Sequence, residues 1–190
     1  MIRELIMKNR SYRRFYQDVK ISREELEEFV DLARLSSSGS NRQPLKYILS
    51  YEEERNKLIF SHLGWAKLIK DWGGPAEGER PAAYLIMLGD KEISPGYMWD
   101  PGIACQSILL GAAEKGLGGC IINSVAREAL GDTLHIPERY EIILVLALGK
   151  PRETVVIEEL QEGQSTHYWR DENQVHHVPK RSLAEIIVRL

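Results

Sequence analysis

The chain has 190 residues, of which 43% are hydrophobic and 28% are charged, and its formal net charge at pH 7 is −3. This composition is typical of a globular protein that is large enough to bury one hydrophobic core. The slightly acidic balance does not favour nucleic acid or an anionic membrane as a partner. No apolar run approaches the roughly 20 residues that span a bilayer, and residues 1–15 are too charged for a secretory signal peptide. We therefore expect a cytoplasmic protein that binds neither nucleic acid nor membrane.

The first half of the chain alternates between helical and strand patterns. Ser22 followed by Glu25 is a capping box, which predicts a helix that continues to about Leu35. The continuous apolar run over 82–88 indicates a buried strand, whereas residues 61–80 follow no clear period. The elements predicted in this half are helices over 2–9, 22–35 and 52–60 and strands over 45–51 and 82–88.

A long apolar helix dominates the second half. Asp100 and Pro101 predict its start, with the Asp100 carboxylate as the N-cap, and Gly116 predicts its end after Lys115. A helix with so few charges belongs in the centre of a domain or in a subunit interface. The remaining predictions are strands over 119–122 and 141–148, helices over 125–130 and 182–190, and a mostly irregular segment over 151–178.

Helices and strands mix without strict βαβ alternation, so we predict an α+β fold with helices packed on a sheet, in a single domain over residues 1–190. The glycine-rich run from Gly116 to Gly119 does not change this prediction. A dinucleotide-binding loop follows a strand and opens a helix, whereas here a helix ends and a strand begins. The glycines are therefore interpreted as a helix cap and a tight turn.

The cysteines and histidines do not predict a metal site. Cys105 and Cys120 lie in apolar surroundings without metal-ligand spacing, so we expect two buried thiols. None of the five histidines has a partner at metal-ligand spacing, and His176 and His177 are interpreted as a surface pair in a loop. No Ser-His-Asp or Cys-His arrangement stands out either. We assign no metal and no catalytic side chain.

Positive charge gathers near both ends of this acidic chain. The segment Arg10–Arg14 holds three arginines and Ser11, and Lys180 is followed directly by Arg181. Guanidinium and ammonium groups commonly hold phosphate monoesters. The two segments would meet only through folding, and the alternative interpretation of each one is a solvated surface patch.

A polar loop from Ser36 to Pro44 connects a predicted helix to a predicted strand. Its Ser, Gly, Asn and Gln residues offer hydroxyls, amides and free backbone N–H groups to a ligand. The alternative interpretation is an ordinary connection.

Four segments, in this order and at these separations, resemble the FMN-dependent nitroreductase family: Asn9–Phe15, Ser36–Pro44, Gly116–Asn123 and Val178–Arg181. The resemblance covers nearly the whole chain. It implies a nitroreductase-like fold with a central, mostly antiparallel sheet flanked by helices, and a homodimer with shared active sites. The residues that it implies for FMN binding are Arg10, Ser11, Arg13, Ser37, Ser38, Gly39, Asn41, Gln43, Ile122, Asn123, Lys180 and Arg181.

The resemblance also implies a role for each group. The residues of the two basic segments would hold the phosphate and ribityl chain, and the polar loop would approach the flavin ring from the neighbouring subunit. A backbone N–H near Ile122 or Asn123 would be donated to flavin N5. The sequence departs from the family pattern at Ser37, where proline is usual, at Leu45, where an aromatic residue is frequent, and at Asn123, where relatives carry Glu or Gly.

The function implied by the resemblance is an FMN-dependent oxidoreductase that uses NAD(P)H to reduce small acceptors, such as nitroaromatics or quinones, by a ping-pong hydride transfer. Either Arg10 or Arg13 would stabilise the reduced flavin. Three alternatives remain open. The first is a reductive dehalogenase or flavin-fragmenting enzyme on the same scaffold, with residues 61–80 as its lid. The second is a non-catalytic flavin-binding or regulatory module, and the third is a domain that binds another phosphorylated ligand.

Overall fold

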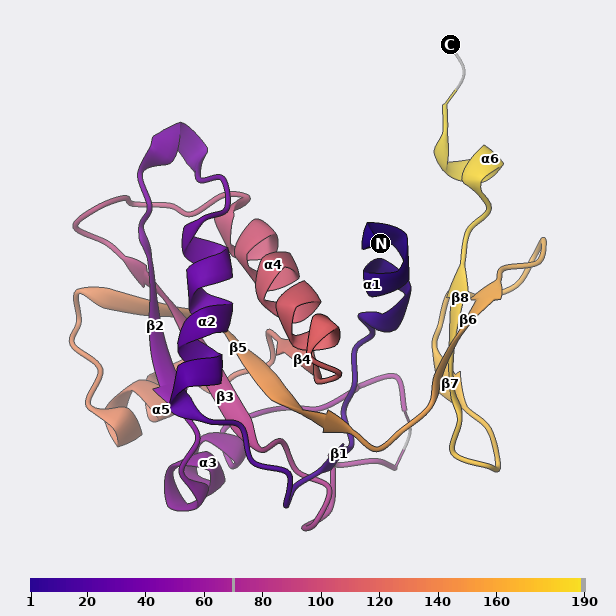
Figure 1. Cartoon of the computed structure of the whole chain (residues 1–190), viewed down its shortest axis with the longest axis horizontal. Helices are drawn as coiled ribbons and strands as arrows, with labels where there is room; N and C mark the ends of the chain where they lie inside the picture. Colours follow the sequence, from indigo (N-terminus) through magenta and orange to yellow (C-terminus); the bar gives the residue numbers. More distant parts are fainter. Residues whose placement is uncertain (70, 189–190) are drawn as a thin grey trace.

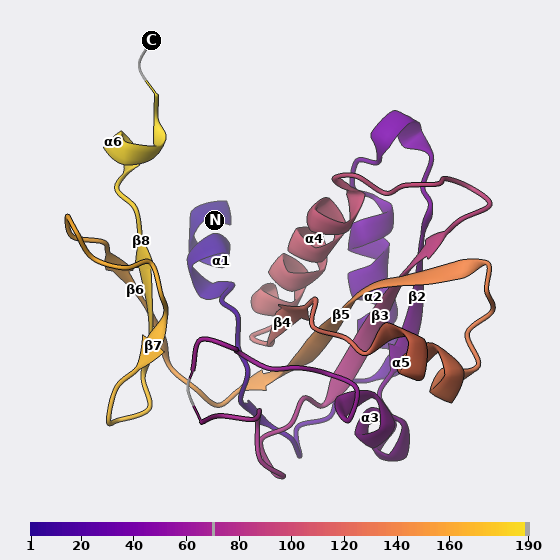
Figure 2. The same cartoon turned by 180° about the vertical axis from the view of Figure 1, so that it is seen from behind.

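The computed structural model describes residues 1–69 and 71–188 and is built around a five-stranded sheet (Figures 1 and 2). The strand order is β1-β5-β3-β2, with β4 paired to β5, and every pair is antiparallel. This arrangement confirms the predicted α+β fold with a central antiparallel sheet. The strands are β1 (Phe15–Tyr16), β2 (Leu45–Ser50), β3 (Ala83–Asp90), β4 (Gly118–Ile122) and β5 (Tyr140–Pro151).

Helices cover both faces of this sheet. On one face, α2 (Arg23–Arg34) and α4 (Asp100–Glu114) pack against the side chains of Leu85 and Met87. On the other face, α3 (Glu53–Phe60) and α5 (Arg127–Leu134) pack against Tyr84, Ile86 and Leu88. Successive side chains of a strand point to opposite faces. Burial on both faces therefore explains why the run over 82–88 is apolar without alternation.

The local helix signals are mostly confirmed. The Ser22 side chain accepts from the backbone N–H of Glu25, and the Glu25 carboxylate accepts from that of Ser22, as the capping box predicts. At the end of α4, Gly116 has a φ of +70°, and the backbone N–H of Leu117 donates to the Ala112 carbonyl oxygen over 2.8 Å. This is a Schellman cap, for which glycine is the favoured residue.

The predicted N-cap role of Asp100 is wrong. No side chain caps the start of α4, and Asp100 itself is the first helical residue. Its buried carboxylate turns instead to the polar loop, where it accepts from the Ser38 hydroxyl over 2.6 Å and from the Gly39 backbone N–H over 2.8 Å. Asp100 thus contacts a loop that is distant in sequence instead of capping its own helix.

The prediction of a mostly irregular segment over 151–178 is incomplete, because it missed three short strands. This part of the chain forms a second sheet of β6 (Val155–Glu159), β7 (Trp169–Arg170) and β8 (His176–Lys180), in the order β6-β8-β7. The β6–β8 pair is parallel, and parallel strands need a long connection, so this pairing has no short-range signal. Helix α1 (Ile2–Lys8) lies between the second sheet and α4 (Figures 1 and 2).

The last helix is shorter than predicted. α6 covers only Leu183–Ile186, with Ser182 as its N-cap, and the end of the predicted range, 189–190, lies outside the described residues. Of the helices in the described residues, none is long and apolar enough to cross a membrane.

Gly119 of β4 has no room for a side chain, because an added Cβ would lie 2.5 Å from the Ala147 carbonyl oxygen on β5. We expect Gly119→Ala to lower the free energy of unfolding by about 1–3 kcal/mol, since backbone must shift to admit it. The matched control is Gly102→Ala in α4, where nothing lies within 4 Å of the added atom. That variant should be stabilised by roughly 0.5–1 kcal/mol. Denaturant unfolding of both variants checks the pair, and equal stabilities would contradict it.

Candidate functional site

A cavity of about 310 Å³ lies where the N-terminal segment meets the second sheet. It brings together four of the predicted residues, namely Arg10, Ser11, Arg13 and Lys180. The fifth residue of the basic segments, Arg181, does not line it. The other lining residues are Asn9, Gln106, Leu109, Ile121, Tyr168, His176 and Val178.

The cationic side chains of this cavity have no acidic partner. Among the described residues, no carboxylate forms an ion pair with Arg10, Arg13 or Lys180. The Nε atom of Arg10 is buried and has no hydrogen-bond partner in the described residues. An unpaired buried donor is costly, so the cavity is suited to an anion.

Three other arginines near these residues in sequence or in space are neutralised by carboxylates. Arg14 makes a two-pronged contact with Glu79, in which both N–O distances are 2.6 Å. Arg170 donates to Glu153 over 2.8 Å, and Arg181 donates to Glu185. The Arg14 guanidinium also holds the pKa of Glu79 below its ordinary value. These three arginines are thus paired with carboxylates, whereas the cations that line the cavity are not.

The N-terminal segment is fixed against β4. Ser11 bridges to Gly119, and the backbone N–H of Tyr12 donates to the Gly119 carbonyl oxygen over 3.0 Å. The Arg13 guanidinium donates to the Ser11 carbonyl oxygen over 3.2 Å and lies 4.9 Å from the centre of the Tyr168 ring. These contacts set the basic side chains beside the strand rather than in bulk solvent.

The register of β4 distinguishes the backbone donors near its end. Gly119 directs its carbonyl toward Tyr12 and hence away from β5. Because strand residues alternate, Ile121 also directs its N–H away from β5, whereas Ile122 takes part in the β4–β5 ladder. The exposed Ile121 side chain lines the cavity, but Ile122 is buried in the core. Asn123, at the end of the strand, accepts from Arg127 over 2.6 Å through its side-chain oxygen.

The polar loop lies away from this cavity. The loop and α1 lie on opposite sides of α4 in both views (Figures 1 and 2), and no loop residue lines the first cavity. The predicted residues Ser37, Ser38 and Gln43 line a second cavity of about 360 Å³, together with Asp100. Gly39 and Asn41 belong to a short 3₁₀ turn beside it.

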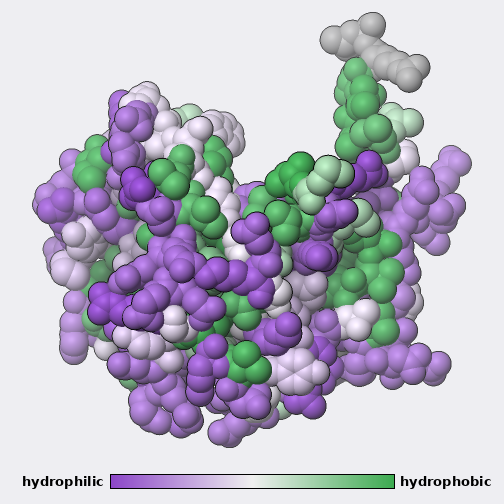
Figure 3. Space-filling view, in the orientation of Figure 1, coloured by the Kyte–Doolittle hydropathy of each residue, from purple (hydrophilic) through white to green (hydrophobic). Residues whose placement is uncertain are grey.

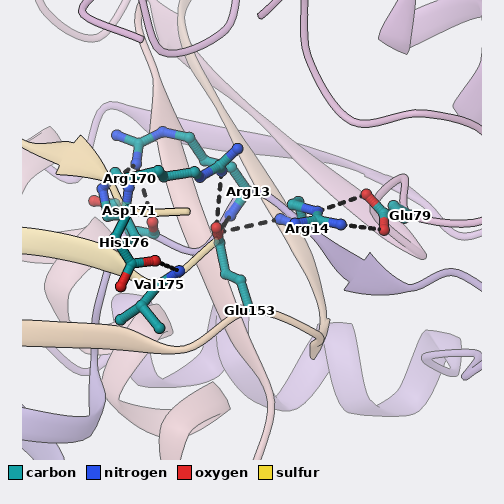
Figure 4. Close-up of polar contacts among 9 residues, drawn as sticks. Arg13, Arg14, Glu79, Glu153, Arg170, Asp171, Val175 and His176 are labelled. Carbon is teal, nitrogen blue, oxygen red and sulfur yellow. Dashed lines mark hydrogen bonds and ion pairs between the residues drawn. The ribbon is translucent and has the colours of Figure 1, made fainter. Parts of the chain in front are cut away.

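Several residues around the site were missed or misread from the sequence. His176 is not on the surface, as only 1% of it is exposed. Burial, reinforced by the charges of Arg13 and Arg170, lowers the pKa of His176 to about 4. Its neutral ring can accept from Arg13, whose Nη1 lies 3.3 Å from Nε2 (Figure 4). Tyr168 and Glu153 carried no local signal, because both act through contacts distant in sequence.

No group of acidic, histidine or cysteine side chains suited to a metal ion occurs within residues 1–69 and 71–188. Both cysteines are buried free thiols, and burial raises the pKa of Cys105 to about 12.

Comparisons with known proteins agree with this fold. A protein of Archaeoglobus fulgidus, whose name assigns it provisionally as an NADH dehydrogenase/NAD(P)H nitroreductase, is 28% identical over 148 residues, which cover 74% of this chain and 80% of that protein. A nitroreductase family protein from Clostridium novyi superposes with a TM-score of 0.67 at 21% identity and covers 99% of both chains. The NADPH:FMN oxidoreductase of Vibrio harveyi, solved with NAD⁺, gives a TM-score of 0.64 at 22% identity, over 86% of this chain and 77% of that chain.

The sequence profile of the nitroreductase family matches residues 6–150. This range includes the central sheet, the N-terminal basic segment and the polar loop. The chain belongs to the nitroreductase family.

Proposed function

We propose that this protein is an FMN-dependent oxidoreductase that takes electrons from NAD(P)H and reduces small acceptors such as nitroaromatics or quinones. The observation that carries the proposal is the cavity in which Arg10, Arg13 and Lys180 lie without acidic partners beside the hydroxyl-bearing Ser11. Family membership and the names of the relatives from Archaeoglobus fulgidus and Vibrio harveyi support it.

The residues of the cavity fit a phosphate monoester. Two guanidinium groups and an ammonium group more than offset the charge of a phosphate dianion, and the buried Nε of Arg10 needs an acceptor. The glycines at 116–119 end a helix and form a strand, so they do not provide the pyrophosphate loop of a dinucleotide site. This combination favours FMN over FAD.

The strand β4 would supply the polar contact to the flavin ring. The backbone N–H groups of Ile121 and Asn123 point away from β5. We therefore favour these two residues over Ile122 as donors to flavin N5. When bound, FMN supplies the redox chemistry between NAD(P)H and the acceptor. The chain holds the cofactor and stabilises negative charge on it through fixed N–H groups and the nearby guanidinium groups.

The proposal includes a homodimer, because no residue of the polar loop, Ser38 and Asn41 included, lines the cavity of its own chain. Of the two places predicted for the apolar helix α4, the centre of a domain or a subunit interface, the structure shows the first, since α2, the sheet and α1 cover most of it. Apolar side chains instead gather on α1 and on the C-terminal segment (Figure 3). The exposed ones there are Ile2, Ile6, Met7, Leu183, Ile186, Ile187 and Val188.

No observation favours the reductive dehalogenase alternative. It depended on a lid formed by residues 61–80, but Trp65 is buried beside Phe60, with ring centroids 5.7 Å apart. Trp72 lies against the Arg170 guanidinium, which is 4.3 Å from its ring centre. Both tryptophans thus belong to the body of the protein.

We expect the purified protein to release FMN on heating, and chromatography of the supernatant identifies the flavin. With NADH or NADPH and a quinone or nitroaromatic acceptor, initial rates should give parallel double-reciprocal plots, because reductant and acceptor would use one site in turn. Release of FAD would contradict the phosphate site. Bound FMN without NAD(P)H consumption would instead support the non-catalytic flavin-binding module.

We expect Arg10→Ala and Lys180→Ala each to weaken FMN binding by roughly tenfold to a hundredfold, which is the effect of losing one charge-assisted hydrogen bond. Arg181→Ala is the matched control, because Arg181 pairs with Glu185 and lies outside the cavity. Titration of the apoprotein with FMN, followed by flavin fluorescence, gives the dissociation constants. Wild-type affinity in both cavity variants would show that these side chains form only a solvated surface.

We expect a homodimer whose interface buries more than about 2,000 Å² in total, as stable assemblies do. FMN should strengthen it, because a ligand that binds only the assembled state shifts the equilibrium toward that state. Analytical ultracentrifugation over a dilution series, with and without FMN, measures both effects. A monomer that retains stoichiometric FMN at micromolar concentration would disprove the shared site.

A further inference from the structure

The side chain of Glu153 is a buried acceptor that joins three distant parts of the chain (Figure 4). One carboxylate oxygen accepts from the backbone N–H groups of Arg13 and Arg14, the latter over 3.2 Å. The other oxygen accepts from Arg170 of β7 over 2.8 Å. Arg13 is 140 residues away in sequence. Glu153 does not line the cavity.

The charged groups of this contact are shielded from water. Only 1% of the Glu153 side chain and 7% of the Arg170 side chain are exposed. A buried carboxylate that loses its partners is strongly unfavourable, so Glu153 keeps both ends of the contact in place. Arg170 is held further by the Trp72 ring, whose centre lies 4.3 Å from the guanidinium.

The contact decides which arginine faces the cavity. Arg13 and Arg14 are adjacent in sequence, but their side chains have different partners. With their backbone N–H groups held by Glu153, Arg14 turns to Glu79, and Arg13 turns to His176 and lines the cavity. A rotation or slip of this segment would present the neutralised arginine instead of the unpaired one.

We infer that Glu153 is a positioning residue for the phosphate group of the flavin. It aligns the Arg13 guanidinium through the backbone and, through Arg170, holds the second sheet that carries Lys180. This inference rests on the proposed function, because it assumes that the cavity takes a phosphate.

The sign of the mutational effect separates positioning from simple charge. A carboxylate near an anion site repels the anion, so its removal would tighten phosphate binding if charge alone mattered. If Glu153 aligns Arg13, its removal weakens phosphate binding in spite of the added positive charge. Riboflavin has the same ring without the phosphate, so it reports on the rest of the flavin site.

The test measures the dissociation constants of FMN and riboflavin for the apoproteins of wild type, Glu153→Ala, Glu153→Gln and Glu79→Gln. We expect Glu153→Ala to weaken FMN by about tenfold or more and riboflavin by less than about twofold, on the scale of one charge-assisted contact. Glu153→Gln retains an oxygen for the two backbone N–H groups but leaves Arg170 without its charged partner, so it should weaken FMN binding less than Glu153→Ala does. Glu79→Gln removes a nearby carboxylate without touching the Arg13 backbone, and its ratio of FMN to riboflavin affinity should match that of wild type.

Each other outcome contradicts a defined statement. A wild-type protein that does not prefer FMN to riboflavin would overturn the phosphate site and the inference with it. A wild-type preference that persists or grows in Glu153→Ala would overturn the inference alone. If Glu153→Ala does not fold, as circular dichroism would show, Glu153→Gln decides. Loss of the FMN preference in folded Glu153→Gln would assign the effect to the ion pair and overturn alignment through the backbone.

Discussion

The buried carboxylate of Glu153 is the contact on which the arrangement of the two chain ends depends. It follows β5, the strand at the centre of the main sheet, and holds both the N-terminal segment and β7 of the second sheet. The second sheet lies beside the main body rather than on it (Figures 1 and 2). Leaving a buried charge unpaired is costly, and this cost keeps the second sheet in place beside the main body.

Charge pairing separates the structural cations from those available to a ligand. Arg14, Arg170 and Arg181 each contact a carboxylate, whereas the cations that line the first cavity have no such partner in the described residues. A guanidinium that is already paired has little to gain from a phosphate, but one that is partly buried and unpaired has much to gain. This difference, rather than the number of basic residues, gives the cavity its preference for an anion.

The polar loop shows how tertiary contacts can override a local signal. Ser40, Asn41 and Gln43 all have positive φ values, which non-glycine residues adopt at a cost unless their surroundings hold them. The Asp100 carboxylate supplies that support by accepting from Ser38 and Gly39, and the Gln43 backbone N–H donates to the Ser38 hydroxyl. The sequence alone predicts that Asp100, before Pro101, caps a helix. Its actual partners, Gly39 and Ser38, are 61 and 62 residues away and therefore leave no local signal.

The sequence by itself determined the elements whose causes are local or periodic: the capping box at Ser22, the glycine cap at Gly116, and the central strands whose apolar runs reflect burial on both faces. The four segments that resemble the family also predicted the candidate site residues, of which Arg10, Ser11, Arg13 and Lys180 line one cavity. Only the tertiary structure decided which basic residues stay unpaired, since the carboxylates of Glu79 and Glu153, which contact Arg14 and the Arg13 backbone, are distant in sequence. The same holds for β6 and β8, because a parallel pair leaves no pattern among neighbours in sequence.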